Sequence, residues 1–454
     1  MKLCRLIATY VVLSASIPLT VYAQTPEPAG AVLFENVRIF DGTATRLSDA
    51  QNVLVRGNVI ERVTPDAVPL PAGAVAIDGR GRTLMPGLID AHAHLMMNTI
   101  PMLLLVTGEP NYLQLRAAAG ARDFLLAGFT SARDLSGPVF GLKRAIDEGL
   151  VAGPRIWPSG PMISQTSGHA DFRALNQLPG SLARDPQVAV RFGYGAIADG
   201  VPEVQKVVRE QLMQGASQVK LAVGGGVSSH YDPIDVTQYS LEEIRAAVGA
   251  AEDWGTYVTV HAYTPRAVRR AIDAGVKVID HGQLLDEPTI RLMAEKGVWL
   301  EIQPFLLDED AGRREGEAAR KYEQVAEGTD RAYRLAKKHG VKIAFGVDML
   351  FNPNGNVRQA HYLAKLTRWF TPAEILKMAT ADNAELLALS GPRNPYPGRL
   401  GVVEEGALAD LLLVQGDPLA DIELLSDPGA NLLVVMKNGK VYKNIAAAAT
   451  SSRP

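Results

Sequence analysis

The stretch "LIDAHAHL", Leu88–Leu95, places two histidines two residues apart at the end of an apolar run. In an extended segment His92 and His94 project to the same face, so their imidazoles can bind one cation jointly. An isolated His-x-His pair is equally compatible with two polar residues on an ordinary strand. The choice between these readings depends on whether the fold brings further ligands to the same place.

The chain beyond this stretch alternates short apolar runs with helical segments, which is typical of βα units around a parallel sheet. Helices are expected in residues 201–215 and 240–255, and Ser240 and Glu243 have capping-box spacing. Eight such units over roughly 300 residues predict an α/β fold, a TIM (β/α)8 barrel over residues 87–398. The predicted strands are residues 87–92, 130–135, 155–160, 218–223, 257–262, 276–281, 298–303 and 342–348.

The two ends of the chain differ from the middle in their residue pattern. Residues 24–86 and 399–445 contain short β-rich runs separated by Gly and Asn, which indicates hairpins of a small sheet. We therefore predict one small β-sandwich domain formed from both chain ends. Residues 446–454, "AAAATSSRP", are predicted to be a disordered tail.

Residues 1–23 have the pattern of a secretory signal peptide. Lys2 and Arg5 precede an apolar run, and Val21-Tyr22-Ala23 has the small residues of a cleavage site. The run is short for a membrane span, so the alternative, an uncleaved anchor, is less favoured and no stable membrane insertion is expected after cleavage. The sequence predicts export to the periplasm or secretion.

The composition restricts the chemistry. Of 454 residues, 47% are hydrophobic and 21% charged, and the formal net charge of -3 provides no basic field for nucleic acid, which is not an expected partner. The single cysteine, Cys4, lies inside the predicted signal peptide. A mature chain without cysteine excludes disulfides and thiolate ligands, so nitrogen and oxygen atoms must hold any metal.

Active sites of TIM barrels lie at the carboxyl ends of the strands, and this rule places several polar side chains together. Five predicted strands carry a metal-capable or catalytic group within or at their ends. Neutral imidazole is a suitable ligand for zinc, copper, iron or nickel. The groups are His92, Lys220, His261, His281 and Asp348.

Two of these residues have alternative interpretations. Lys220, within the apolar run "VKLAV", is either a strand-end lysine that pairs with an acid or a desolvated amine. A neutral amine can add carbon dioxide, and the resulting carbamate is able to bridge two cations. Asp348 closes "FGVD" and either contacts a metal and its water or caps the following helix.

Five motifs together carry a family resemblance: "PGLIDAHAHL", "VKLAVGGG", "HAYTPRAVRRAIDAGVKVIDHG", "GVD" and "GALADLLLVQGDPLADI". In this order the chain resembles the metal-dependent amidohydrolase superfamily, in the group with a carboxylated-lysine binuclear centre. Within that group it is similar to Xaa-Pro dipeptidase-like carboxypeptidases and ochratoxinase-like amidases.

The resemblance implies a ligand set and a mechanism. His92, His94 and Asp348 would bind one divalent metal, His261 and His281 the other, and carboxylated Lys220 would bridge the pair. The usual metal of the family is Zn²⁺. Two cations acidify a bridging water, hydroxide attacks the scissile carbonyl, and Asp348 serves as general base and then as general acid.

Loops after the strands should determine the substrate. The long connection from about residue 160 to residue 200 is expected to form a lid or pocket wall, and His169 within it resembles a family position near the substrate carbonyl. His230 or Tyr231 is a candidate for contact with a substrate carboxylate. Tyr263 stands where many relatives have the second histidine of His-x-His, and it either donates a hydrogen bond to the substrate or packs as a rim aromatic.

Three further residues are weaker candidates. Arg393 and His361 have little local support as substrate contacts. His339, in "RLAKKHG", is expected to interact with the end of its own helix rather than with substrate.

These observations predict a binuclear metallo-amidase that cleaves an amide bond to a carboxylate-bearing amino acid, in a dipeptide, an N-acyl amino acid or an ochratoxin A-like conjugate. One alternative is a cyclic amide or lactone hydrolase with the same metal centre. An alternative of another class is a non-catalytic binding or assembly module that retains the barrel. Because such barrels often assemble, a homo-oligomer is expected.

Overall fold

The computed structural model describes residues 30–173, 188–229, 231–311, 314–353 and 355–446. The predicted signal peptide and residues 447–454 of the predicted tail lie outside these ranges. Within them, no helix has the length and apolar character needed to cross a bilayer.

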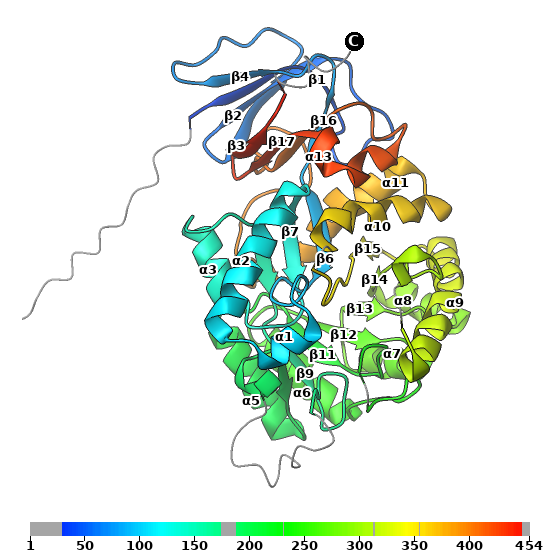
Figure 1. The fold of residues 1–454 in the computed structure, drawn as a ribbon. Helices are drawn as coiled ribbons and strands as arrows, with labels where there is room; N and C mark the ends of the chain where they lie inside the picture. Colours follow the sequence, from blue (N-terminus) through cyan, green and yellow to red (C-terminus); the bar gives the residue numbers. More distant parts are fainter. Residues whose placement is uncertain (1–29, 174–187, 230, 312–313, 354, 447–454) are drawn as a thin grey trace, which may run out of the picture.

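Strands from both chain ends form one eight-stranded sheet, at the top of Figure 1. Its order is β18-β17-β16-β5-β1-β2-β3, and β4 pairs with β1. Strand β5 joins the two halves, because it is parallel to β1 and antiparallel to β16. The strands are β1 Val32–Ile39, β2 Gln51–Arg56, β3 Val59–Thr64, β4 Val75–Asp78, β5 Thr83–Pro86, β16 Leu411–Val414, β17 Leu432–Lys437 and β18 Lys440–Asn444.

The remainder of the described chain is an α/β unit with two parallel sheets, and all eight predicted strands are present. One sheet has the order β6-β7-β8 and the other β10-β9-β11-β12-β13-β14-β15. Residues of β6, β7 and β11 to β15 are buried throughout, which explains their apolar runs. The strands are β6 Leu88–Ala93, β7 Phe129–Asp134, β8 Arg155–Pro158, β9 Met162–Ser164, β10 Gly195–Ile197, β11 Val219–Ala222, β12 Val258–Ala262, β13 Val278–His281, β14 Trp299–Ile302 and β15 Ile343–Phe345.

Hydrogen bonds connect the two parallel sheets at two places, one beside each outer strand of the three-stranded sheet. At one junction the Ser217 amide donates a hydrogen bond to the carbonyl of Pro158, with an N···O distance of 2.8 Å. At the other the Asp348 amide donates to the carbonyl of His92, at 2.9 Å. The second bond brings Asp348, three residues after β15, directly beside the histidine of β6.

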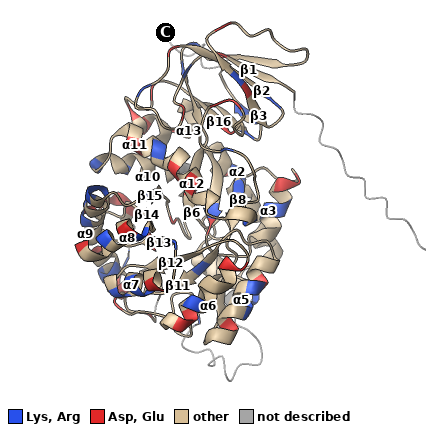
Figure 2. Ribbon diagram, turned by 180° about the vertical axis from the view of Figure 1, so that it is seen from behind, with Lys and Arg blue, Asp and Glu red and all other residues tan. Residues whose placement is uncertain are grey.

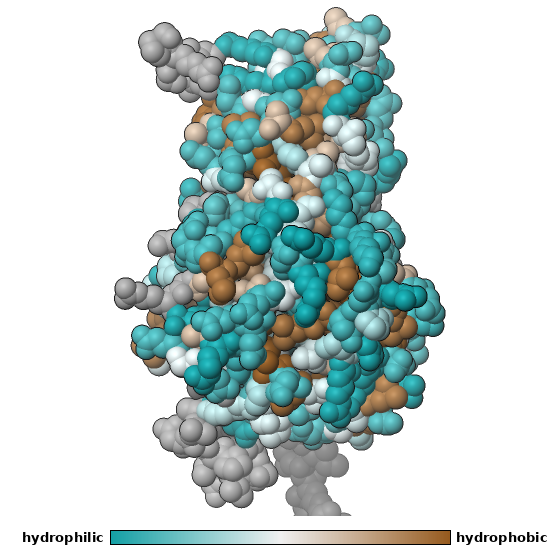
Figure 3. Space-filling view, turned by 90° about the vertical axis from the view of Figure 1, so that its right-hand side faces the viewer, coloured by the Kyte–Doolittle hydropathy of each residue, from teal (hydrophilic) through white to brown (hydrophobic). Residues whose placement is uncertain are grey.

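Helices lie around the parallel strands (Figure 1), and both signs of charge are interspersed on α5 to α9 (Figure 2). The surface on the side of α9 is mainly hydrophilic with separate apolar patches (Figure 3). The capping box predicted at Ser240 and Glu243 is confirmed at the start of α6. The helices are α1 Met102–Thr107, α2 Pro110–Leu126, α3 Phe140–Asp147, α4 Val188–Arg191, α5 Val201–Met213, α6 Leu241–Glu252, α7 Pro265–Asp273, α8 Glu287–Lys296, α9 Gly316–His339, α10 Gln359–Lys365, α11 Pro372–Lys377, α12 Asn383–Ala388 and α13 Pro428–Asn431.

A buried ion pair joins the chain-end sheet to the α/β unit. Arg155, the first residue of β8, donates two hydrogen bonds to the carboxylate of Asp410, at 2.8 and 3.1 Å. The amide of Asn438 also donates to Asp410, at 2.7 Å. Since Asp410 precedes β16, the C-terminal strands are attached to the α/β unit at a fixed position.

Candidate metal centre

The six predicted metal-binding side chains line one cavity of about 410 Å³. Five of them lie at or up to three residues beyond the carboxyl end of a parallel strand, and Lys220 lies within its strand. The six are His92 and His94 from β6 and its following residue, Lys220 from β11, His261 from β12, His281 from β13, and Asp348 three residues after β15.

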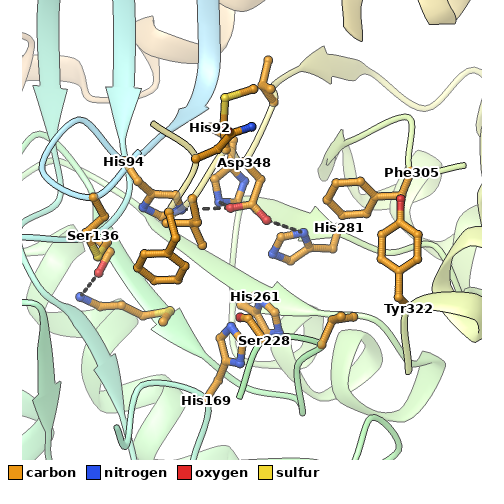
Figure 4. A pocket seen from close by; sticks show the side chains of 18 of the residues that line it. His92, His94, Ser136, His169, Ser228, His261, His281, Phe305, Tyr322 and Asp348 are labelled. Atoms are coloured by element: carbon orange, nitrogen blue, oxygen red, sulfur yellow. Dashed lines mark hydrogen bonds and ion pairs between the residues drawn. The ribbon is translucent and has the colours of Figure 1, made fainter. Parts of the chain in front are cut away.

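The carboxylate of Asp348 lies among three imidazoles (Figure 4). One oxygen is 3.0 Å from Nε2 of His94 and 3.4 Å from Nε2 of His92. The other oxygen is 3.9 Å from Nδ1 of His281. His261 completes the group, with its ring centroid 4.4 Å from that of His281. This arrangement brings together ligand types that transition metals bind.

The protonation states suit metal binding. Burial lowers the pKa of His92 and His261 well below the ordinary value, and it lowers that of His281 to about 3. Burial alone would raise the pKa of Asp348, but the surrounding imidazoles outweigh it and hold the pKa below its usual range. Near neutral pH these three imidazoles are therefore neutral and the Asp348 carboxylate is ionised, which are the forms that coordinate metals.

Two of the site residues have unusual backbone geometry. His281 has φ 83° and Asp348 has φ 52°, both in the left-handed region that residues with a Cβ rarely adopt. Such conformations cost free energy and are concentrated at functional sites. Here they coincide with the last residue of β13 and the end of the "FGVD" motif.

A second row of polar side chains, which the sequence analysis did not select, orients the histidines. Oε2 of Glu301 is 2.5 Å from Nδ1 of His92, and Nδ1 of His281 donates to Oε1 of Gln303 at 2.8 Å. Gln303 also donates to both oxygens of Glu301, at 2.8 and 2.9 Å. Burial and the nearby Asp280 raise the pKa of Glu301 well above its ordinary value. The sequence did contain a signal for Glu301 and Gln303, because both are polar residues on one face of an otherwise apolar strand.

Lys220 is paired with an acid. Its Nζ donates to Oδ2 of Asp280 at 2.6 Å, and both side chains are almost fully buried. Asp280 also accepts hydrogen bonds from Arg133, at 2.7 Å, and from Thr259, at 2.6 Å. Burial would raise the pKa of Asp280, but Lys220 and Arg133 lower it below its ordinary value. Asp280 and Arg133 were also missed, since nothing in the sequence shows which buried charges meet.

The predicted substrate-binding residues have different positions. His169 and Tyr263 line the cavity. The His169 ring stacks on His261 with centroids 3.9 Å apart, and its Nδ1 is 2.8 Å from Oγ of Ser229. Tyr263 is buried, with its ring 5.0 Å from that of His281. Tyr231 is half-buried and is not among the described residues that line the cavity, and His230 lies outside the described residues.

The weaker candidates lie away from the metal-binding group. His361 contacts Asp310, with 3.1 Å between Nε2 and Oδ2, and Arg393 lies over the ring of Trp254. The prediction for His339 is wrong in its partner: Nε2 is 2.7 Å from Glu287, in the first turn of α8. The imidazole therefore connects two helices instead of binding the end of its own.

The rest of the cavity wall is largely apolar, and the sequence analysis did not identify it. Phe305 and Tyr322 lie on the side of His281 in Figure 4, with their ring centroids 5.9 Å apart. Single aromatic residues on a loop and on a helix carry no local signal that they face a common cavity. The apolar contributors include Met97, Met162, Phe172, Val227, Phe305, Tyr322 and Tyr362.

The fold and site therefore define a parallel α/β protein with a His/Asp cluster at the carboxyl ends of its strands. The amidohydrolase family model matches residues 83–442, so the chain belongs to the amidohydrolase family. It is 35% identical to the ochratoxinase of Aspergillus niger over 372 residues, which cover 79% of this chain and 75% of that protein.

Solved structures agree with this assignment. A prolidase complexed with N-methylphosphonate-L-proline has a TM-score of 0.83 and 35% identity, covering 91% of this chain and 100% of the other. A Xaa-Pro dipeptidase with bound methionine in its active site has a TM-score of 0.79 and 30% identity, with coverages of 91% and 100%. The A. niger ochratoxinase structure has a TM-score of 0.79 and 28% identity, with coverages of 92% and 96%.

Proposed function

We propose that the protein is a binuclear metal-dependent amidohydrolase that releases a carboxylate-bearing amino acid from a small amide. The substrates are dipeptides, N-acyl amino acids or ochratoxin A-like conjugates. The observation that carries the proposal is the convergence of the four histidines, Lys220 and Asp348 on one cavity. Similarity to proteins named as an ochratoxinase and prolidases supports the substrate class.

The donor set fits two divalent cations. His92, His94 and Asp348 have ligand atoms close enough to share one ion, and Nδ1 of His94 is a buried atom without a hydrogen-bond partner in the described structure. His261 and His281 would hold the second ion, with Lys220 between the two as a carbamate. When bound, zinc ions in such a site acidify a water and polarise a carbonyl.

The protein side chains then supply proton transfer and orientation. Asp348, held ionised by its imidazole neighbours, accepts a proton from the attacking water and gives it to the departing amine. His169 and Tyr263 line the same cavity and are positioned to contact the substrate. Carbamate formation requires Lys220 to leave Asp280, whose carboxylate keeps its hydrogen bonds from Arg133 and Thr259.

Two architectural features belong to the same proposal. The hydrogen bonds at both junctions of the parallel sheets support their closure into a (β/α)8 barrel. Residues 1–23 support export, and N-terminal sequencing of the mature protein tests cleavage after Ala23.

The first test is hydrolysis by protein purified in zinc and bicarbonate. It is incubated with dipeptides, N-acyl amino acids and ochratoxin A, and released amino acids are identified by mass spectrometry. We expect release from at least one subset, loss of activity on chelation, and recovery with zinc. Hydrolysis of only lactones or cyclic amides by the metal-loaded protein would overturn the proposed substrate class.

Variants distinguish catalysis from a binding role. Asp348→Asn should lower kcat at least about a hundredfold, the usual contribution of an acid–base group. Lys220→Ala should reduce both metal content and activity. The control is His339→Asn, since His339 lies on α9 outside the cavity, and it should retain activity. A protein that binds a partner but hydrolyses nothing would keep that binding in the Lys220→Ala variant.

A further inference from the structure

Arg314 is a cation at the cavity without a counter-ion in the described structure. Its side chain lines the same cavity as the metal-binding group and is exposed. No carboxylate oxygen of the described residues lies within 4.0 Å of its nitrogens, whereas the other cationic side chain of the cavity, Lys220, is paired with Asp280. The guanidinium is therefore available to an external anion.

Neighbouring cations show that this state is unusual for the region. Arg358 is 2.9 Å from Asp310, and Lys365 contacts both Asp308, at 2.7 Å, and Asp310, at 2.5 Å. His361 also contacts Asp310. The nearby carboxylates are thus occupied by other side chains, and Arg314 is left out of their network.

An aromatic ring holds the guanidinium in place. Cζ of Arg314 lies 4.1 Å from the centroid of the Tyr322 ring, a cation–π distance. The Tyr322 hydroxyl donates to the carbonyl of Leu306 at 2.9 Å, so the ring itself is anchored. A guanidinium stacked on a ring keeps its edge N–H groups available for bidentate binding of a carboxylate.

Arg314 shares its cavity with the metal-binding group. Arg314 and Tyr263 line the same cavity. Tyr263 stacks against His281 of the metal-binding group. Arg314 and the metal-binding group therefore face one cavity.

We propose that Arg314 binds a carboxylate group of the substrate, with Tyr322 as its platform. This inference rests on the proposed function and names the residue that gives the cavity its preference for acidic amides. The carboxylate is either the α-carboxylate of the amino acid released or the carboxylate of an acidic side chain. In both cases the guanidinium forms charge-assisted hydrogen bonds that a neutral isostere cannot match.

The test measures binding of reaction products, which requires no turnover. Isothermal titration calorimetry on zinc-loaded protein compares L-phenylalanine with L-phenylalaninamide, and L-glutamate with L-glutamine. Arg314→Ala should weaken binding of the carboxylate member of one pair about tenfold, the loss of one hydrogen-bonded ion pair, with little effect on its amide. Arg314→Lys should have an intermediate effect because it keeps the charge without the fork geometry.

Arg320→Ala is the matched control, since Arg320 is exposed on α9 and is not among the cavity-lining residues. It removes the same charge and should change each dissociation constant less than twofold. A selective loss for phenylalanine assigns the α-carboxylate, and a loss confined to glutamate assigns the side-chain carboxylate.

Because glutamate and glutamine share an α-carboxylate, an α-carboxylate role weakens both of them equally while sparing phenylalaninamide. Equal weakening within both pairs, no effect of Arg314→Ala, or no wild-type binding of either carboxylate would overturn the proposal. These outcomes are separate from failure of the proposed function. The proposed function fails if the wild-type protein releases no amino acid from any amide. This result does not depend on whether the protein binds the products.

Discussion

Gly346 allows two ligand-bearing segments to approach each other. A Cβ at this position would lie 2.3 Å from Oε1 of Glu301 and 2.6 Å from Cβ of His92. Gly346 lies two residues before Asp348, so the missing side chain permits the segment after β15, which carries Asp348, to pass beside the strand that carries His92. A change at this position therefore affects both stability and the site.

Gly346→Ala is expected to lower the free energy of unfolding by about 1–3 kcal/mol, because the added methyl group forces buried neighbours apart. Gly249→Ala is the control, since Gly249 is exposed in α6 and a Cβ there would meet no atom within 4 Å. This control should be neutral or stabilise by up to about 1 kcal/mol. Urea unfolding measures both, and equal stabilities for the two variants would contradict the steric argument.

Glu301 controls the tautomer of His92. Because its carboxyl group is bound to Nδ1, Nε2 of His92 faces Asp348. Loss of such a partner commonly lowers metal affinity about 10–100-fold. We expect this loss for Glu301→Ala in competition with a chelator, and none for Glu295→Ala, which removes an exposed glutamate of α8. Wild-type zinc affinity in Glu301→Ala would show that His92 is oriented by packing alone.

Local sequence identifies the site residues that belong to a motif, and it misses residues whose partners are distant in the chain. His92, His94 and Asp348 stand at strand ends in recognisable patterns. Glu301 and Asp280 are equally buried, but their partners, His92 and Lys220, are 209 and 60 residues away in the chain. Which of the buried polar groups meet depends on strand order, and local sequence does not contain it.

Helix α9 fixes the loop that follows β11. Lys321 on α9 is buried, and its Nζ donates to the carbonyls of Gly226, Ser229 and Asp232, at 3.2, 3.1 and 2.9 Å. Ser229 in turn contacts His169 at the cavity. The lysine therefore positions one wall of the site without lining the cavity itself.

Lys321→Met should loosen this loop, because three carbonyls lose their donor at a cost of about 1–3 kcal/mol. Hydrogen–deuterium exchange should become faster in the peptide spanning residues 223–239, and KM should rise more than kcat falls. Lys338→Met, an exposed lysine of the same helix, is the control. Unchanged exchange in the loop of Lys321→Met would remove the positioning role.

Strands with a continuous apolar run were predictable from the sequence, and the shortest strands were not. Each of the eight predicted strands coincides with an observed one, since buried parallel strands give continuous apolar runs. Strands β9 and β10 were missed inside the long connection between residues 160 and 200, because three residues are too few to show a period. The expected lid or wall in this connection falls partly on residues 174–187, outside the described residues.

The composition of the two chain ends predicted that both would contribute strands to one small β-sandwich, and the described strands of both ends belong to one eight-stranded sheet. Strand β16 pairs with β5 across more than 300 residues of intervening chain, with Leu411 opposite Pro86 and Leu412 opposite Met85. The composition indicated β structure at both ends, but it contained no information about the Arg155–Asp410 ion pair that holds this sheet on the α/β unit. Long-range electrostatic pairs of this kind depend on the assembled fold.

The buried histidines make the stability of the metal-free protein sensitive to acid. Burial lowers the pKa of His281 to about 3, against 6.5 in an unfolded chain, so the unfolded state binds more protons between these values. The free energy of unfolding therefore falls as the pH drops below 6.5. Between pH 6.5 and 5.0 the His281 contribution to this fall is about 1.5 kcal/mol.

His281→Asn should therefore lose about 1.5 kcal/mol less stability than the wild type when metal-free protein is moved from pH 6.5 to 5.0. Urea unfolding at the two pH values measures the difference, and His339→Asn, a half-buried histidine outside the cavity, is the comparison. Above pH 6.5 the imidazole of His281 is neutral in both the folded and the unfolded state. In that range His281 therefore does not lower the free energy of unfolding of the wild type. An identical decline in wild type and His281→Asn would mean that His281 is not held neutral by burial, and the argument for preformed neutral ligands would fail with it.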